Sequence, residues 1–167
     1  MKKYRKLKWL NKLNENLNNI TIQLKNKGDT MSDIKKVDDF ITEAGVFFLA
    51  STDGDQAKCR PLGFHMLVDD KIYFGVGTFQ EVWKQIQENP KIEIVALAPE
   101  KDKFIRYYGK ATADDNPELV EKCFEIMPEI AAIYKENGWE MGIFYLDDAT
   151  AEFRNIMTVE ETLKFKY

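Results

Sequence analysis

The stretch Lys71-Ile-Tyr-Phe-Gly-Val-Gly-Thr-Phe-Gln-Glu-Val-Trp-Lys-Gln-Ile-Gln-Glu-Asn-Pro90 decides the fold of this 167-residue chain. It predicts a strand through Val76, a glycine-containing turn, and then a helix. Thr78 and Glu81 stand in the S/T-x-x-E arrangement of a capping box, which predicts that the helix starts at Thr78. The helix should end at Asn89, because the residue before a proline disfavours the helical conformation.

The sequence before this stretch predicts a helix and a hairpin. Ser32 is a suitable N-cap for a helix through about Ala44, and Gly45 can end that helix. Residues 46–52 form an apolar run typical of a buried strand, and Asp53-Gly54 is a hairpin turn signal. The chain should then return as a strand over residues 56–68, with a second turn at residues 69–70.

The sequence after the central stretch alternates β-rich segments with one helical region. Pro117 opens that region, which extends to about residue 138, and Pro128 should break it into two segments. Gly109 is expected at a bulge, and Asp147-Asp148 at a turn. The expected strands after Pro90 cover residues 91–98, 103–113, 141–146, 150–156 and 162–167.

The predicted elements define the fold class. Six to eight strands lie mostly in antiparallel hairpins, with two or three helices between them. This pattern favours a mainly β (α+β) protein, a small antiparallel β-barrel with peripheral helices. We expect one domain over residues 31–167.

Composition and charge exclude several functions. Residues 31–167 carry sixteen Lys/Arg and twenty-six Asp/Glu, and this net charge of −10 argues against nucleic acid as a partner. Two isolated cysteines and a single histidine, His65, make a metal site improbable. No apolar run approaches the roughly 20 residues of a membrane span, and no secretory signal is evident, so we expect a cytoplasmic protein with reduced thiols.

The first thirty residues differ from the rest of the chain. They hold eight Lys/Arg, two Asp/Glu and six Asn. Leucine and isoleucine at spacings of three and four fit a docking or membrane-surface helix, and the basic charge fits a disordered tail. A third hypothesis is that residues 1–30 are not native, because codons for Lys27-Gly28-Asp29 can spell a bacterial ribosome-binding sequence before Met31.

Two basic residues are candidates for binding a phosphate. Lys84 lies in the predicted helix after Gly75, Gly77 and Thr78, where backbone N–H groups, a hydroxyl and the helix dipole favour an anion. Arg60 lies in a strand, beside Pro61, and could hold a phosphate in a bidentate manner. A solvated lysine and a surface ion pair are the competing interpretations of these two residues. No Walker P-loop occurs.

The ordered set of segments resembles the pyridoxamine 5′-phosphate oxidase-related family, the FMN-binding split barrels. The likeness runs from residue 33 to residue 167 through five segments. They are Val46-Phe-Phe-Leu-Ala-Ser-Thr-Asp-Gly-Asp55, Arg60-Pro-Leu-Gly63, Lys71–Pro90, Lys103-Phe-Ile-Arg-Tyr-Tyr-Gly-Lys-Ala111 and Gly142-Ile-Phe-Tyr-Leu-Asp-Asp-Ala-Thr-Ala-Glu-Phe153.

This resemblance implies a split barrel that forms a homodimer with FMN between the subunits. It implies that Arg60 and Lys84 bind the FMN phosphate, that the turn at Gly77-Thr78 lies near this phosphate, and that the strand at Pro61-Leu62 presents backbone groups to the flavin ring. We expect an oxidoreductase that uses FMN as a redox carrier, with no side chain yet assigned as catalytic. A non-enzymatic redox sensor or carrier, or a barrel that holds haem or a deazaflavin, are the alternatives.

The C-terminal sequence argues against one substrate. The authentic oxidase of this family ends in a signature with a tryptophan and an Arg-Leu-His segment. Here Glu152-Phe-Arg-Asn-Ile156 has no tryptophan, and no histidine follows. We therefore do not expect pyridoxine phosphate to be the substrate.

Overall fold

The computed structural model describes residues 33–167, and the predictions for residues 1–32 lie outside this range. Residues Ile34–Tyr167 form one unit. It begins with a helix over residues 33–44, which Gly45 ends with a positive φ of 73° and an N–H bond to the carbonyl of Ile41. The buried face of this helix, Ile34, Val37 and Ile41, is fully inaccessible to solvent.

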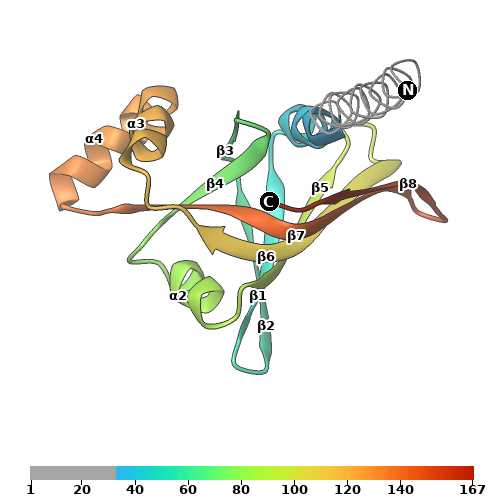
Figure 1. Ribbon diagram of the computed structural model, residues 1–167, viewed down its shortest axis with the longest axis horizontal. Helices are drawn as coiled ribbons and strands as arrows, with labels where there is room; N and C mark the ends of the chain where they lie inside the picture. The colour runs from blue at the N-terminus through green and yellow to red at the C-terminus, as the bar shows by residue number, and fades with distance from the viewer. Residues whose placement is uncertain (1–32) are drawn as a thin grey trace, which may run out of the picture. The chain divides into compact units, whose positions relative to one another are not determined.

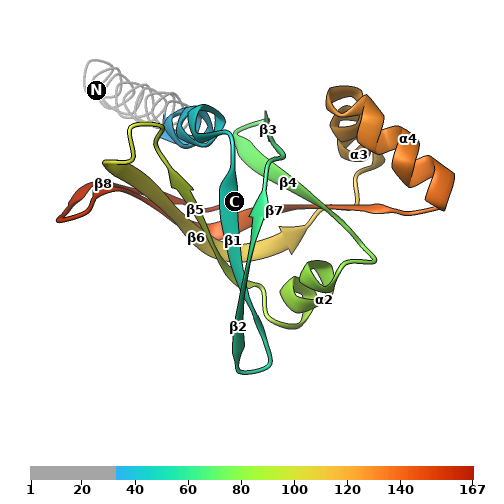
Figure 2. The same ribbon diagram turned by 180° about the vertical axis from the view of Figure 1, so that it is seen from behind.

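Eight strands and three further helices follow the opening helix, in the arrangement of Figures 1 and 2. The strands are β1 (Phe47–Asp53), β2 (Gln56–Leu62), β3 (His65–Val68), β4 (Lys71–Gly77), β5 (Lys91–Leu97), β6 (Lys103–Ala113), β7 (Met141–Asn155) and β8 (Val159–Phe165). The helices are α2 (Glu81–Glu88), α3 (Pro117–Ile126) and α4 (Pro128–Asn137). The break at Pro128 and both proline starts are as predicted.

All eight strands belong to one antiparallel sheet, ordered β2-β1-β5-β6-β7-β4-β3, with β8 paired to β7. The long strand β7 pairs with β6 along most of its length. On its other side it pairs with β4 through its first half and with β8 through its second. The sheet therefore divides at β7, and its hydrogen bonding stays open, which confirms the split-barrel fold class.

The chain connects the two ends of this strand order directly. We expected one return strand over residues 56–68, and this prediction was wrong. The strand breaks at Gly63-Phe64, so that β2 pairs with β1 while β3 pairs with β4. A two-residue link between the opposite edges requires the sheet to curl on itself, and Figure 2 shows β1 and β2 crossing over β6 and β7.

A second difference concerns Asp147-Asp148, where a turn was predicted. The strand β7 is continuous there, and the register against β6 shifts between Tyr108 and Lys110. The bulge predicted at Gly109 is confirmed, and Asp148 takes a positive φ of 45° opposite it. The two aspartates thus lie at a β-bulge. A residue of this bulge takes a left-handed backbone conformation, which aspartate tolerates better than most residues.

The core fills the inside of the curled sheet. Its largest fully buried side chains include Tyr107, Phe47, Phe74 and Phe144, with ring contacts between Phe74 and both other phenylalanines. Figure 1 shows the helix over residues 33–44 and α2 at opposite ends of β1. A second apolar cluster under α3 contains Met66, Tyr73, Leu119, Cys123 and Ile143.

Candidate functional site

Arg60 lies on β2 and reaches across β1 toward α2. Its Nη1 donates to the carbonyl of Leu49 at 3.2 Å and to Oγ of Ser51 at 2.7 Å. Its Nη2 donates to Oε1 of Gln85 on α2 at 2.8 Å. All three acceptors are uncharged, so they orient the guanidinium without neutralising it.

Ser51 and Gln85 fix the position of α2 against β1. Both are buried, with 5% and 4% of their surfaces exposed. The hydroxyl of Ser51 donates to the same Oε1 of Gln85, at 2.7 Å. Because buried polar groups are costly unless hydrogen-bonded, this triad of Arg60, Ser51 and Gln85 holds together as a unit. We call it the Arg60 junction.

The charge of Arg60 has no anionic partner within ion-pair distance among residues 33–167. Burial lowers the pKa of the guanidinium, while the charges of Cys59 and Glu81 act in the opposite direction. A half-buried cation surrounded by neutral acceptors attracts an anion, since the local dielectric is lower than in water. The Arg60 junction is therefore suited to a phosphate or carboxylate.

The turn at Gly77-Thr78 is arranged differently from our prediction. The N–H of Thr78 donates to the carbonyl of Glu140 at 3.0 Å, and its hydroxyl to the same oxygen at 3.3 Å. The helix begins at Glu81 with Gln80 as its N-cap and without a side-chain cap bond. The predicted capping box is wrong, because Thr78 bonds to Glu140, the residue before β7, and does not cap α2.

Gln80 and Gly77 shape the same turn. The N–H of Gly77 donates to Oε1 of Gln80 at 3.1 Å. A Cβ on Gly77 would lie 2.5 Å from Cε1 of Phe79 and 2.9 Å from the hydroxyl of Tyr134. The glycine is thus required for close approach, and its N–H already has an acceptor.

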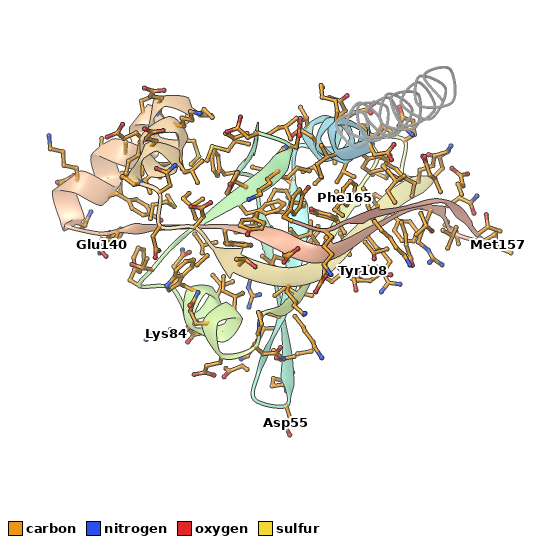
Figure 3. All side chains as sticks on the ribbon, in the orientation of Figure 1. Asp55, Lys84, Tyr108, Glu140, Met157 and Phe165 are labelled. Carbon is orange, nitrogen blue, oxygen red and sulfur yellow. The ribbon has the colours of Figure 1, made fainter. Side chains whose placement is uncertain are left out.

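Lys84 is exposed on α2 and forms no ion pair within the described part of the chain. Figure 3 shows it on the side of α2 that faces away from β1 and β2. Its neighbour Gln85 faces inward to Arg60. The structure therefore places both predicted phosphate residues around α2, but does not bring their charged groups into contact.

Pro61 and Leu62 end β2, which is an edge strand paired only with β1. Pro61 is exposed, and Leu62 packs partly against the main core. The free edge agrees with the confinement of proline to edge strands. It leaves backbone groups available to a ligand at this end of the strand.

Sequence reasoning missed Ser51 and Gln85. Each is a polar residue at a position where the pattern demands an apolar one: Ser51 in a buried strand, and Gln85 on the face of α2 that holds Val82 and Ile86. A polar residue at a core position is a signal that a buried partner exists, and here that partner is Arg60.

His65 and the two cysteines were the remaining candidates. Nε2 of His65 lies 3.1 Å from Oγ1 of Thr42 and 3.3 Å from Oδ1 of Asp38, which ties β3 to the opening helix. Both cysteines are free thiols, and burial raises the pKa of Cys123 to about 11. Residues 33–167 contain no group of three or more metal-ligating side chains, and none of their helices has the length and apolar character of a membrane span.

Comparisons with known proteins place the chain in a family. A family model described as pyridoxamine 5′-phosphate oxidase matches residues 34–142. A NimC/NimA family protein from Clostridium acetobutylicum is 27% identical, with a TM-score of 0.72, over 81% of this chain and 94% of that one. No match was found among curated proteins.

More distant solved structures share the fold. General Stress Protein 26 from Bacillus anthracis is 14% identical, with a TM-score of 0.59, over 79% of this chain and 98% of that one. A FAD-binding protein from Mesorhizobium loti is 9% identical, with a TM-score of 0.51, over 70% of this chain and 91% of that one. At these identities the likeness concerns the fold alone.

Proposed function

Because the chain belongs to the pyridoxamine 5′-phosphate oxidase-related family, we propose that it binds FMN and acts as a flavoprotein oxidoreductase. The observation that carries this proposal is the Arg60 junction, a half-buried cation held by three neutral acceptors. A phosphate would supply the charge that the described residues leave unmatched there. Bound FMN would supply the redox chemistry, and the protein its orientation and surroundings.

The proposed division of labour follows from the contacts. Arg60 would bind the phosphate directly, and Ser51 and Gln85 would keep its guanidinium in place. Lys84 would add a long-range positive charge from the exposed side of α2. The free edge of β2 at Pro61 and Leu62 would offer backbone groups to the flavin ring. Gly77 and Thr78 would define the nearby turn rather than donate to the ligand, because their N–H groups are already bonded.

We propose that the protein is a homodimer. Val46, just before β1, Phe48 of β1 and Leu97 of β5 are exposed, with 52%, 47% and 46% of their surfaces accessible. Because Phe47 opposes Ala96 in the antiparallel pair, Leu97 lies across from Val46. Val46 and Phe48 are two residues apart, so their side chains lie on the same face. A contiguous apolar patch of this kind favours a protein interface. Sedimentation of the native chain and of Phe48→Lys tests this, and we expect the variant to dissociate.

The absorbance spectrum of the purified protein tests the cofactor. We expect flavin bands, and a released ligand whose mass is that of FMN. Arg60→Ala should weaken FMN binding by about ten- to a hundredfold, the effect of one charged hydrogen-bonded contact. A colourless protein that takes up no added FMN would reject the proposal, as would unchanged affinity in Arg60→Ala.

Kinetics separate the oxidoreductase from the alternatives. NAD(P)H oxidation with turnover on an added acceptor supports the enzyme, whereas FMN binding without turnover supports a redox carrier or sensor. Pyridoxine phosphate should not be oxidised. Haem held by His65 is disfavoured, because its Nε2 already lies near Asp38 and Thr42, and its Nδ1 is buried.

A further inference from the structure

Two aromatic side chains, Phe79 and Trp139, form an exposed stack beside the turn that precedes α2. Their ring centroids lie 4.3 Å apart, and 45% and 41% of their surfaces are accessible. Both rings pack on the buried ring of Tyr134, with centroid distances of 6.0 Å and 5.9 Å. We call Phe79 and Trp139 the aromatic platform. The exposed faces of such rings carry partial negative charge and attract cations.

The end of α4 fixes the position of Trp139. Gly138 takes a positive φ of 66°, and its N–H donates to the carbonyl of Lys135 at 3.4 Å. The N–H of Trp139 donates to the carbonyl of Tyr134 at 2.9 Å. These two bonds form a Schellman motif, which folds the residue after the glycine back onto the last turn of the helix. Trp139 is therefore held against Tyr134 by the backbone.

The turn before α2 fixes the position of Phe79. The N–H and the hydroxyl of Thr78 both donate to the carbonyl of Glu140, so the neighbours of these two residues are brought together. Gly77 allows the close approach, since a Cβ there would lie 2.5 Å from Cε1 of Phe79. The aromatic platform is thus preorganised, which lowers the entropic cost of binding.

The segment that carries Trp139 is strongly acidic. Residues 114–140 hold eight Asp/Glu and two Lys, and this net charge of −6 is the larger part of the −10 of residues 31–167. None of these ten side chains forms an ion pair within residues 33–167. Glu136 lies in the last turn of α4 and Glu140 follows Trp139, and both are exposed. Unpaired charge of one sign attracts a partner of the opposite sign.

The aromatic platform lies apart from the apolar patch proposed as the subunit interface. Figures 1 and 2 show α4 and the start of β7 at one end of the molecule, away from β1 and β5. Figure 3 shows Glu140 at this end, and Asp55 at the tip of the β1–β2 hairpin. A dimer formed through β1 and β5 therefore does not use this surface.

We propose that the aromatic platform, with Glu136 and Glu140, is a docking surface for an arginine-rich segment of a partner protein. A guanidinium stacks on the exposed rings, and neighbouring arginines pair with the two carboxylates. Arginine fits better than lysine, because its guanidinium is planar and more weakly hydrated. The occupant is a peptide segment and not a single cation, because the acidic residues extend over both α3 and α4. This proposal does not rest on the proposed FMN site.

Fluorescence anisotropy of labelled peptides tests the proposal on the native full chain. We expect hexa-arginine to bind, hexa-lysine to bind about two- to fivefold more weakly, and hexa-glutamate not to bind. A rise in salt from about 50 to about 500 mM should weaken hexa-arginine binding by about tenfold or more. N-acetylarginine amide, a single cation, should displace the peptide only at a far higher concentration.

Variants locate the surface. Trp139→Leu keeps an apolar side chain but removes the indole face, and should weaken hexa-arginine binding about two- to fivefold. Glu140→Gln should weaken it about twofold, and Glu136→Gln combined with Glu140→Gln about fivefold. Asp55→Asn, an exposed aspartate outside the ion pairs of residues 33–167, is the matched control and should change nothing.

Two further measurements separate this surface from the other proposals. Flavin content should be the same in Trp139→Leu and in the native chain, so failure of the FMN proposal remains distinguishable. The sedimentation coefficient should also be the same. A smaller particle in Trp139→Leu would mean that a second copy of the chain covers the aromatic platform, and would overturn the proposal.

Three binding results would also overturn it. They are equal affinity for hexa-arginine and hexa-glutamate, equal affinity for hexa-arginine and N-acetylarginine amide, and unchanged hexa-arginine affinity in both Trp139→Leu and the double glutamine variant. A native chain that binds no hexa-arginine at low salt would reject the docking surface outright.

Discussion

Arg60 and Lys84 were predicted as two halves of one phosphate site, and the structure gives them opposite surroundings. Arg60 is half-buried and held by Leu49, Ser51 and Gln85, whereas Lys84 is exposed and has no ion-pair partner in the described range. A fixed cation at low dielectric interacts more strongly with an anion than a mobile one in water. We therefore expect most of the binding energy at Arg60.

The largest effect is expected when a hydrogen-bond partner of Arg60 is removed. Gln85→Leu deletes the acceptor that serves both Arg60 and Ser51, and leaves the buried hydroxyl of Ser51 and one N–H group of the half-buried Arg60 without it. We expect unfolding in urea to show a loss of about 3 kcal/mol. Gln87→Leu, on the exposed side of α2, is the control and should change stability by less than about 0.5 kcal/mol. Equal effects would mean that the junction contributes no stability.

The next test compares the two cations directly. Titration with FMN should give a loss of about ten- to a hundredfold in affinity for Arg60→Ala. Lys84→Ala should cost about two- to fivefold, because its charge is screened by solvent. Arg60→Lys should recover only part of the affinity, since an ammonium cannot reproduce the three contacts of the guanidinium. A larger effect at Lys84 than at Arg60 would reverse the assignment.

A smaller effect is expected at the turn that was predicted to cap α2. Gly77→Ala forces Phe79 and Tyr134 to shift, and the exposed Phe79 can move most easily. We expect a stability loss of about 1 kcal/mol. Gly63→Ala is the matched control: the nearest atom to its Cβ, the carbonyl oxygen of Gly45, is 3.9 Å away. That variant should be about 0.5 kcal/mol more stable, through a less flexible unfolded chain.

The smallest effect concerns pH. Burial lowers the pKa of Arg60, so charge loss would begin at a lower pH than for an ordinary arginine. A lowered pKa means that the folded state loses this proton at a lower pH than the unfolded state does. The free energy of unfolding would therefore rise only as the pH passes the lowered pKa of Arg60. Arginine still stays charged between about pH 6 and pH 9. FMN affinity should therefore show no titration of Arg60 across this range.

Much of the fold was predictable because its signals are local. The hairpin at Asp53-Gly54, the bulge at Gly109 and the helix break at Pro128 each follow from the backbone preferences of one or two residues. The failed predictions have long-range causes. Thr78 bonds to Glu140, sixty-two residues away in sequence, which no local capping rule can reveal.

The sequence by itself determined the strand and helix content, the family and the two basic residues worth testing, because periodicity, turn chemistry and residue type are properties of short segments. Tertiary structure decided that hydrogen bonds hold Arg60 in place and that Lys84 is exposed to solvent. It did so by placing Ser51 and Gln85, thirty-four residues apart, against the same guanidinium. It also broke the return strand at Gly63, since the two edges of a curled sheet must be joined there.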